Sequence, residues 1–221
     1  MGVHGEQIRQ GYLQTAGGCR VGLCGCAYGQ AAGQIDGIRQ LSSVSVRIPH
    51  AVPGCADALL PQLLRDGFCS TLILSPPGNG KTTLLRECVR CLSDMGTRIS
   101  LMDERGEIAA VQNRAPQFDV GANTDVMTGG QKAACCMMLL RAMRPDVLVL
   151  DEPTAGLDPA GRDEIFELVR NYHKQSGATI LIVSHSMEDI AQIADRLLVM
   201  NHAKVLFCDT PREVFSHADE I

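Results

Sequence analysis

Short, largely aliphatic runs recur along the later part of the chain, and a longer stretch of mixed polar and apolar positions follows most of them. Four of these runs cover residues 71–74, 98–102, 147–150 and 179–183. Apolar runs of four or five residues are typical of strands buried on both faces, and the stretches between them are long enough for helices. Strands that alternate with helices in this way predict a parallel sheet wound on both faces.

The amphipathic stretches predict helices. Pro159 stands just ahead of a regular one, where its fixed φ suits the first helical turn. Two further apolar runs, 196–200 and 204–208, flank a tight turn and predict adjacent strands. Residues 111–128 carry proline, glycine and asparagine and are expected to form a loop. The expected helices are 55–64, 84–92, 131–143, 160–172, 187–193 and 212–217.

The first fifty residues follow a different pattern. Residues 12–15 and 19–23 flank a Gly17-Gly18 turn, which is a hairpin signal, and residues 43–49 alternate like a strand until proline stops them. We therefore expect two parts: a small β-rich appendage over residues 1–54 and an α/β domain over residues 55–221.

Composition narrows the class of protein. The 221 residues are 45% hydrophobic but only 4% aromatic, without tryptophan, so the core has to be largely aliphatic. The net charge of −5 offers no basic field for nucleic acid, and the 10 cysteines indicate reduced thiols rather than a disulfide framework. No apolar signal segment or membrane-spanning run is found. These features predict a cytoplasmic protein that binds no nucleic acid and reaches the inner face of the membrane only through a partner protein.

The run at 71–74 leads into a turn of proline and glycine and then into a helix, which is the context that a phosphate-binding loop requires. The glycines let backbone N–H groups converge, and the helix directs its positive end at the same point. Lys81 adds a mobile charge for the outer phosphates, and the Thr82 hydroxyl is a suitable Mg²⁺ ligand. Ser75 stands where the strict motif has glycine. The predicted ATP-binding residues are Ser75, Pro76, Pro77, Gly78, Asn79, Gly80, Lys81, Thr82 and Thr83.

Acidic residues and a histidine follow the other predicted strands, and the carboxyl ends of parallel strands meet at one edge of a sheet. Asp151 follows four aliphatic residues and is the predicted Mg²⁺ ligand of a Walker B motif, with Glu152 placed to orient the attacking water. His185 is predicted to sense the γ-phosphate from a neighbouring strand. Glu104 and its neighbour Asp103 are either ligands of metal or water or only a surface turn, and Glu104 is a second candidate for orienting water.

From about residue 5 to residue 152 the chain resembles the stage III sporulation protein AA family, a relative of the type II/IV secretion ATPases. Serine at position 75 is normal in that family. The resemblance also implies that the family's longer N-terminal region is truncated here. The resemblance implies a P-loop ATPase of the RecA-like (ASCE) class that drives or assembles a secretion-like channel. The segments that carry it are 8–12, 17–22, 75–86, 103–108 and 119–126.

From about residue 142 onward the chain resembles instead the ATPases of ABC transporters, especially those of energy-coupling-factor transporters. Residues 151–159 resemble a Walker B motif joined to a D-loop, residues 184–189 a switch-histidine segment, and residues 209–215 the tail after the last strands. Residues 127–131 resemble the ABC signature sequence. This resemblance implies the ATP-binding subunit of an importer for vitamins or metal ions.

The sequence therefore reads as a hybrid of two ATPase families, joined between residues 129 and 152, and natural fusion, recombination and design are all compatible with such a join. We expect a homo-oligomer that hydrolyses Mg-ATP; an importer subunit and a hybrid without hydrolytic activity are the alternatives. The stretch between Lys81 and Gly129 is too short for the helical arm that carries the signature sequence in ABC transporters. The expected assembly is a ring in which a neighbour offers an arginine, with Arg105 and Arg47 as candidates.

Overall fold

The computed structural model describes the backbone of most of the chain, and this backbone divides into two compact units, residues 1–50 and residues 51–221. The described residues are 7–14, 20–28, 37–47, 50–65, 67–76, 78–128, 132–184, 194–202 and 204–217.

The first unit contains three strands, β1 (Gln7–Gln14), β2 (Arg20–Tyr28) and β3 (Gly37–Arg47). They form an antiparallel sheet in the order β1-β2-β3. The pairing of β1 with β2 confirms the predicted hairpin, whose glycine turn lies outside the described residues. β3 begins well before residue 43, where the prediction placed its start, because polar residues between 39 and 43 hide the alternation.

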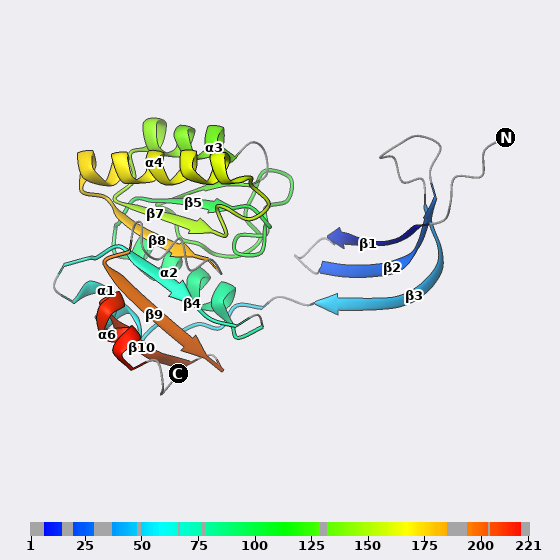
Figure 1. The fold of residues 1–221 in the computed structure, drawn as a ribbon, viewed down its shortest axis with the longest axis horizontal. Helices are drawn as coiled ribbons and strands as arrows, with labels where there is room; N and C mark the ends of the chain where they lie inside the picture. The colour runs from blue at the N-terminus through cyan, green and yellow to red at the C-terminus, as the bar shows by residue number, and fades with distance from the viewer. Residues whose placement is uncertain are drawn as a thin grey trace. The chain divides into compact units, whose positions relative to one another are not determined.

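The second unit contains seven described strands: β4 (Thr71–Leu74), β5 (Ile99–Asp103), β6 (Thr124–Met127), β7 (Val147–Asp151), β8 (Thr179–Val183), β9 (Arg196–Asn201) and β10 (Lys204–Asp209). They form one sheet in the order β10-β9-β4-β8-β7-β5-β6 (Figure 1). Neighbours are parallel except for β9 and β10, which pair antiparallel. The predicted parallel sheet and the predicted final strand pair are therefore confirmed, and β8 alone separates β4 from β7.

Helices cover both faces of this sheet. The first layer contains α1 (Leu60–Leu64) and α2 (Lys81–Asp94). The second layer contains α3 (Lys132–Met138), the π-helical turn η1 (Leu139–Met143), α4 (Pro159–Ser176) and α6 (Pro211–Ser216). Successive side chains of β7 alternate between the layers: Val147 and Val149 pack in the first, and Leu148 and Leu150 in the second. Burial on both faces explains why the predicted strands are largely apolar runs.

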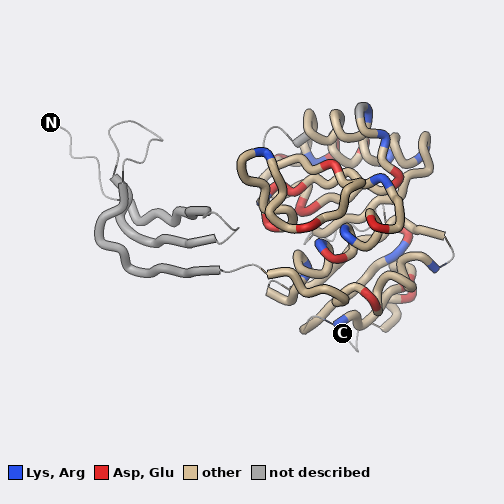
Figure 2. The backbone as a smooth tube through the Cα atoms, turned by 180° about the vertical axis from the view of Figure 1, so that it is seen from behind, with Lys and Arg blue, Asp and Glu red and all other residues tan. Residues whose placement is uncertain are grey.

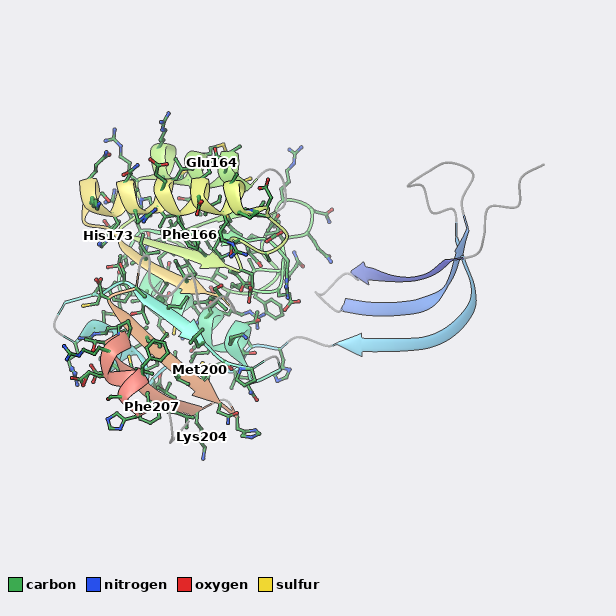
Figure 3. The ribbon with its side chains drawn as sticks, viewed as in Figure 1. Glu164, Phe166, His173, Met200, Lys204 and Phe207 are labelled. Atoms are coloured by element: carbon green, nitrogen blue, oxygen red, sulfur yellow. The ribbon has the colours of Figure 1, made fainter. Side chains whose placement is uncertain are left out.

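α4 shows how local signals fix a helix. The Asp158 side chain accepts a hydrogen bond from a backbone N–H of the first turn at 2.9 Å, Pro159 occupies that turn, and Gly177 closes the other end. Phe166 is fully buried on the side that faces the sheet, whereas Glu164 is exposed on the opposite side (Figure 3). Among the described helices, neither α4 nor any other combines the length and the apolar character needed to cross a membrane.

Three further elements differ from the prediction. Residues 55–59, expected to begin a helix, form turns, and α1 is only five residues long with proline in its first turn. α2 begins at Lys81 rather than at residue 84. The predicted loop contains β6, an edge strand whose half-exposed side chains lack the apolar run of a central strand. The helix predicted over residues 187–193 lies outside the described residues.

Candidate functional site

A glycine-bearing loop joins β4 to α2 at the carboxyl edge of the sheet. Gly78 and Gly80 have φ angles of 80° and 83°, a region that side chains disfavour. Gly80 is the N-cap of α2, so the N–H groups of the first helical turn, which have no acceptor within the helix, lie next to the loop. The Lys81 ammonium donates a hydrogen bond across the loop to the Ser75 carbonyl at 2.5 Å. The loop therefore gathers backbone N–H groups and a cation, a combination that binds anions.

Lys81 lies within electrostatic reach of the neighbouring strand ends. Burial lowers the pKa of its ammonium, and the positive charge of Arg105 lowers it further, whereas the carboxylates of Glu152 and Asp151 raise it. Because β8 separates β4 from β7, these opposite charges face one another across one strand rather than along the chain.

Asp151 ends β7 in a crowded acidic environment. It is the register partner of Asp103 on β5, and both aspartates are buried. Burial, together with the negative charges of Asp103, Glu152 and Glu107, raises the pKa of Asp151 to about 7. Figure 2 shows acidic positions gathered on the side of the sheet at which β5 and β7 end. A cation at this edge would stabilise the ionised carboxylates.

Glu152 follows β7 in an unusual backbone conformation. Its φ is 51°, which is uncommon for a residue with a side chain. Its N–H donates to the Val183 carbonyl of β8 at 2.9 Å, and its own carbonyl accepts from the N–H of Ala155 at 3.1 Å. The residue is only 8% exposed. Strain that neighbouring structure holds in place occurs frequently at functional sites, and the hydrophobic pattern contains no signal for it.

Asp103 organises the loop that follows β5. Its two carboxylate oxygens accept hydrogen bonds from the backbone N–H groups of residues 107–109, at 2.8 to 3.0 Å. From the other side, the buried Arg86 guanidinium donates to the carbonyls of Glu107 and Ile108 and stacks over the Phe118 ring at 3.8 Å. Sequence reasoning missed this role of Asp103 and Arg86, because the contacts join residues that share no local motif.

The same loop carries two residues that the sequence singled out. Glu104 is half-buried in the turn directly after β5, next to the acidic edge, and its catalytic role stays a prediction. Arg105 is exposed, and its charge lowers the pKa of both Lys81 and Asp151. The Arg105 charge therefore acts on the candidate site of its own chain.

The structure thus brings most of the predicted site to one edge, and adds a contact. The Asn79 side chain in the phosphate loop donates to the Asn201 side chain at the end of β9 at 3.3 Å, which links the loop to the outer hairpin. Thr82 and Thr83 lie half-buried at the start of α2. Pro77 and His185 lie outside the described residues, and their predicted roles are untouched by the structure.

The family model for sporulation stage III, protein AA, matches residues 1–209 of the chain. The chain belongs to this family. Within the sporulation stage III, protein AA family, the chain is 39% identical to stage III sporulation protein AA of Bacillus subtilis over 153 residues, which are 66% of this chain and 49% of that protein.

A second group of relatives consists of transporter ATPases. The chain is 55% identical over 89 residues to the energy-coupling factor transporter ATP-binding protein EcfA2 of Clostridioides difficile, covering 40% of this chain and 31% of that protein. A nucleotide-free ATP-binding cassette from an ABC transporter is similar in structure, with a TM-score of 0.49 and 18% identity over 68% of this chain and 84% of that one. Both resemblances found in the motifs are confirmed. The chain spans less than half the length of either curated relative.

Proposed function

We propose that this protein binds Mg-ATP at the carboxyl edge of its sheet and hydrolyses it. One observation carries the proposal: the Lys81 loop and the Asp151–Glu152 pair lie one strand apart, close enough for the two carboxylates to act on the pKa of Lys81. A phosphate chain that lay on the loop would meet cationic groups on one side and carboxylates on the other.

The residues at this edge fit Mg²⁺ and a triphosphate. The Thr82 hydroxyl and the Asp151 carboxylate are hard oxygen donors, and Mg²⁺ prefers a few such ligands together with phosphate oxygens. A buried aspartate with a pKa of about 7 is one that a divalent cation would keep ionised. When bound, Mg²⁺ neutralises phosphate charge and polarises the terminal phosphoryl group. The loop N–H groups and Lys81 would bind the phosphates.

Glu152 is the proposed residue for orienting and polarising the attacking water. Its hydrogen bond to β8 fixes the backbone directly after the Mg²⁺ ligand Asp151. A carboxylate carried by a fixed backbone loses less entropy when it positions water, which favours it as a general base. Glu104 is the second candidate for this role, and His185 is proposed to contact the γ-phosphate.

We also propose that the protein works as a homo-oligomer with a membrane-protein partner. The support is its family membership and its similarity to a transporter's ATP-binding protein. Between α2 and β6 the described residues contain no helix, so a helical arm of the ABC type is absent from this stretch. This absence favours a ring over the ATP sandwich of ABC transporters.

The test is phosphate release by purified Lys81→Ala, with Lys204→Ala as the matched control, since Lys204 is an exposed lysine on β10. We expect Lys81→Ala to lose at least about 100-fold in turnover, because it removes a preorganised charge from the transferred phosphoryl group. Lys204→Ala should keep the wild-type rate. Unchanged turnover in a folded Lys81→Ala protein would overturn the site.

The similarity to EcfA2 supports a second candidate, the ATP-binding subunit of an importer. Mass measurement of Glu152→Gln with ATP separates the two. A tight ATP-dependent dimer that is broken by Gly130→Trp would favour the importer, whereas a larger ring or an ATP-independent assembly favours the first proposal.

A further inference from the structure

The opposite edge of the sheet has a hollow of its own. The starts of β5, β7 and β8 meet there with the ends of η1 and α4, and the side chains around them enclose about 630 Å³. The hollow is open to solvent and lies at the amino ends of the strands. The candidate nucleotide site lies at their carboxyl ends, so the two are separated by the length of the sheet.

The hollow is lined by three arginines and one carboxylate. Arg98 and Asp146 form a bidentate pair, with Nη2 to Oδ1 at 2.7 Å and Nε to Oδ2 at 3.0 Å. Arg141 and Arg144 are exposed, and the described residues include no carboxylate paired with either of them. The net charge of the lining is therefore positive in a chain whose total charge is −5.

The backbone that carries two of these arginines departs from regular geometry. Arg141 lies in η1, a π-helical turn, and Arg144 has a φ of 48° directly before Pro145. Left-handed conformation in a residue with a side chain is unfavourable, and π-helical turns occur often at functional sites. Cations near a helix end also stabilise its dipole, but that role does not account for Arg98, which precedes a strand.

The remaining lining is partly apolar. Leu140 and Pro145 are buried beneath the hollow, and the Tyr172 hydroxyl donates to the Pro145 carbonyl at 3.2 Å. Gln175 and Ser176, in the last turn of α4, add polar groups at the rim. A recess with an apolar floor and forked cations suits a polypeptide with acidic side chains and some apolar contact area.

We propose that this hollow, the basic groove of Arg98, Arg141 and Arg144, binds an acidic segment of a partner protein. Carboxylates of the segment would pair with Arg141 and Arg144 in the way that Asp146 pairs with Arg98. Nucleic acid is disfavoured because the chain is acidic as a whole and the groove is small. A lipid surface is disfavoured because it contacts protruding side chains, whereas these residues enclose a hollow. The site does not rest on the proposed ATPase function.

Fluorescence anisotropy of a labelled hexaglutamate peptide on the full chain tests the groove. We expect Arg141→Glu/Arg144→Glu to weaken binding at least about tenfold, because two pairs become repulsive. The control Arg114→Glu/Arg212→Glu makes the same change of charge at two exposed arginines outside the groove and should weaken binding by less than about threefold.

A second pair of variants separates guanidinium pairing from charge alone. Arg141→Lys/Arg144→Lys keeps both charges but removes the planar fork, so we expect it to weaken binding about three- to tenfold. Equal losses in the groove and control variants, or full binding by the lysine variant, would overturn the proposal. It would also be overturned if phosphatidylglycerol vesicles or single-stranded RNA bound more tightly than the peptide and lost affinity in the groove variant.

Discussion

Two aspartates at the two ends of β7 differ in burial and in the charges around them. Asp146, just before the strand, is exposed, and its pair with Arg98 lowers the pKa of its carboxyl. Asp151, the last residue of the strand, is buried beside other carboxylates, and its pKa rises to about 7. At one end of β7 the surroundings stabilise the ionised form of Asp146, and at the other end they destabilise the ionised form of Asp151.

The two ends of the sheet differ in what their carboxylates do. Carboxylates whose pKa values are raised by burial and by neighbouring carboxylates are typical of functional sites. Paired surface carboxylates fix elements relative to one another, as Asp146 does by joining the starts of β5 and β7. Among the described residues, the candidate nucleotide site lies at the edge where Asp151 is buried with a raised pKa.

The strongest way to test this division is Glu152→Gln. If the carboxyl edge serves chemistry, the variant should lose about 10²–10⁴ in ATP turnover, because a general base is removed, while nucleotide affinity and thermal midpoint stay close to wild type. Glu164→Gln, on the exposed side of α4, is the control. A normal rate in Glu152→Gln together with a low rate in Glu104→Gln would move the water-orienting role to Glu104.

Asp103→Ala tests whether a carboxylate at that edge anchors the backbone instead of taking part in catalysis. Removing it leaves three backbone N–H groups without acceptors in a site with 0% exposure, so we expect a loss of about 2–4 kcal/mol in unfolding free energy, measured by urea denaturation. Asp119→Ala, which removes a single exposed hydrogen bond, should cost less than about 1 kcal/mol. Equal effects of the two substitutions would contradict the anchoring role.

Glu87 combines the two environments, because it is buried like Asp151 but paired with an arginine like Asp146. Its hydrogen bonds from Arg90 and from the Gly54 N–H lower its pKa to about 2, against 4.5 in the unfolded chain. Its stabilising effect is therefore present above pH 4.5 and disappears as the pH falls toward 2.

We expect Glu87→Gln to lose about 1–2 kcal/mol in unfolding free energy at pH 7, and the difference from wild type to shrink on acidification below pH 4.5. Urea denaturation at several pH values measures this. A difference that stayed constant between pH 7 and pH 3 would show that lost packing, rather than charge, is responsible.

The smallest effect is expected at the amino edge. The Arg98–Asp146 pair has good geometry, but both side chains are exposed, and exposed pairs contribute little. Arg98→Ala should shift the thermal midpoint by less than about 2 °C in a calorimetric scan. A much larger shift would mean that the amino edge, too, depends on a strongly coupled carboxylate.

Much of the fold was predictable because burial on both faces makes the central strands largely apolar. β7 and β8 match their predicted ranges closely for this reason. β6 was missed because an edge strand keeps exposed positions. α1 was placed too early because turns with apolar residues can bury the same side chains as a helix, as Leu59 does.

The candidate site was predictable where its residues are neighbours in sequence. The phosphate loop and the Asp151–Glu152 pair are short motifs that follow buried strands. The hydrogen bond from Arg86 to Ile108 spans 22 positions, and the one from Asn79 to Asn201 spans 122. Such contacts depend on the order of strands in the sheet, which periodicity along the chain does not encode.

The single strand between β4 and β7 also sets a distance. Two strand spacings amount to roughly 10 Å, and this span belongs to the backbone ladder rather than to any side chain. It fixes the separation between the loop that would bind a triphosphate and the carboxylates that would bind its cation. If two families share this strand order, they can exchange the segments on either side of the intervening strand and keep the same separation. A chain that resembles two ATPase families can therefore retain one site.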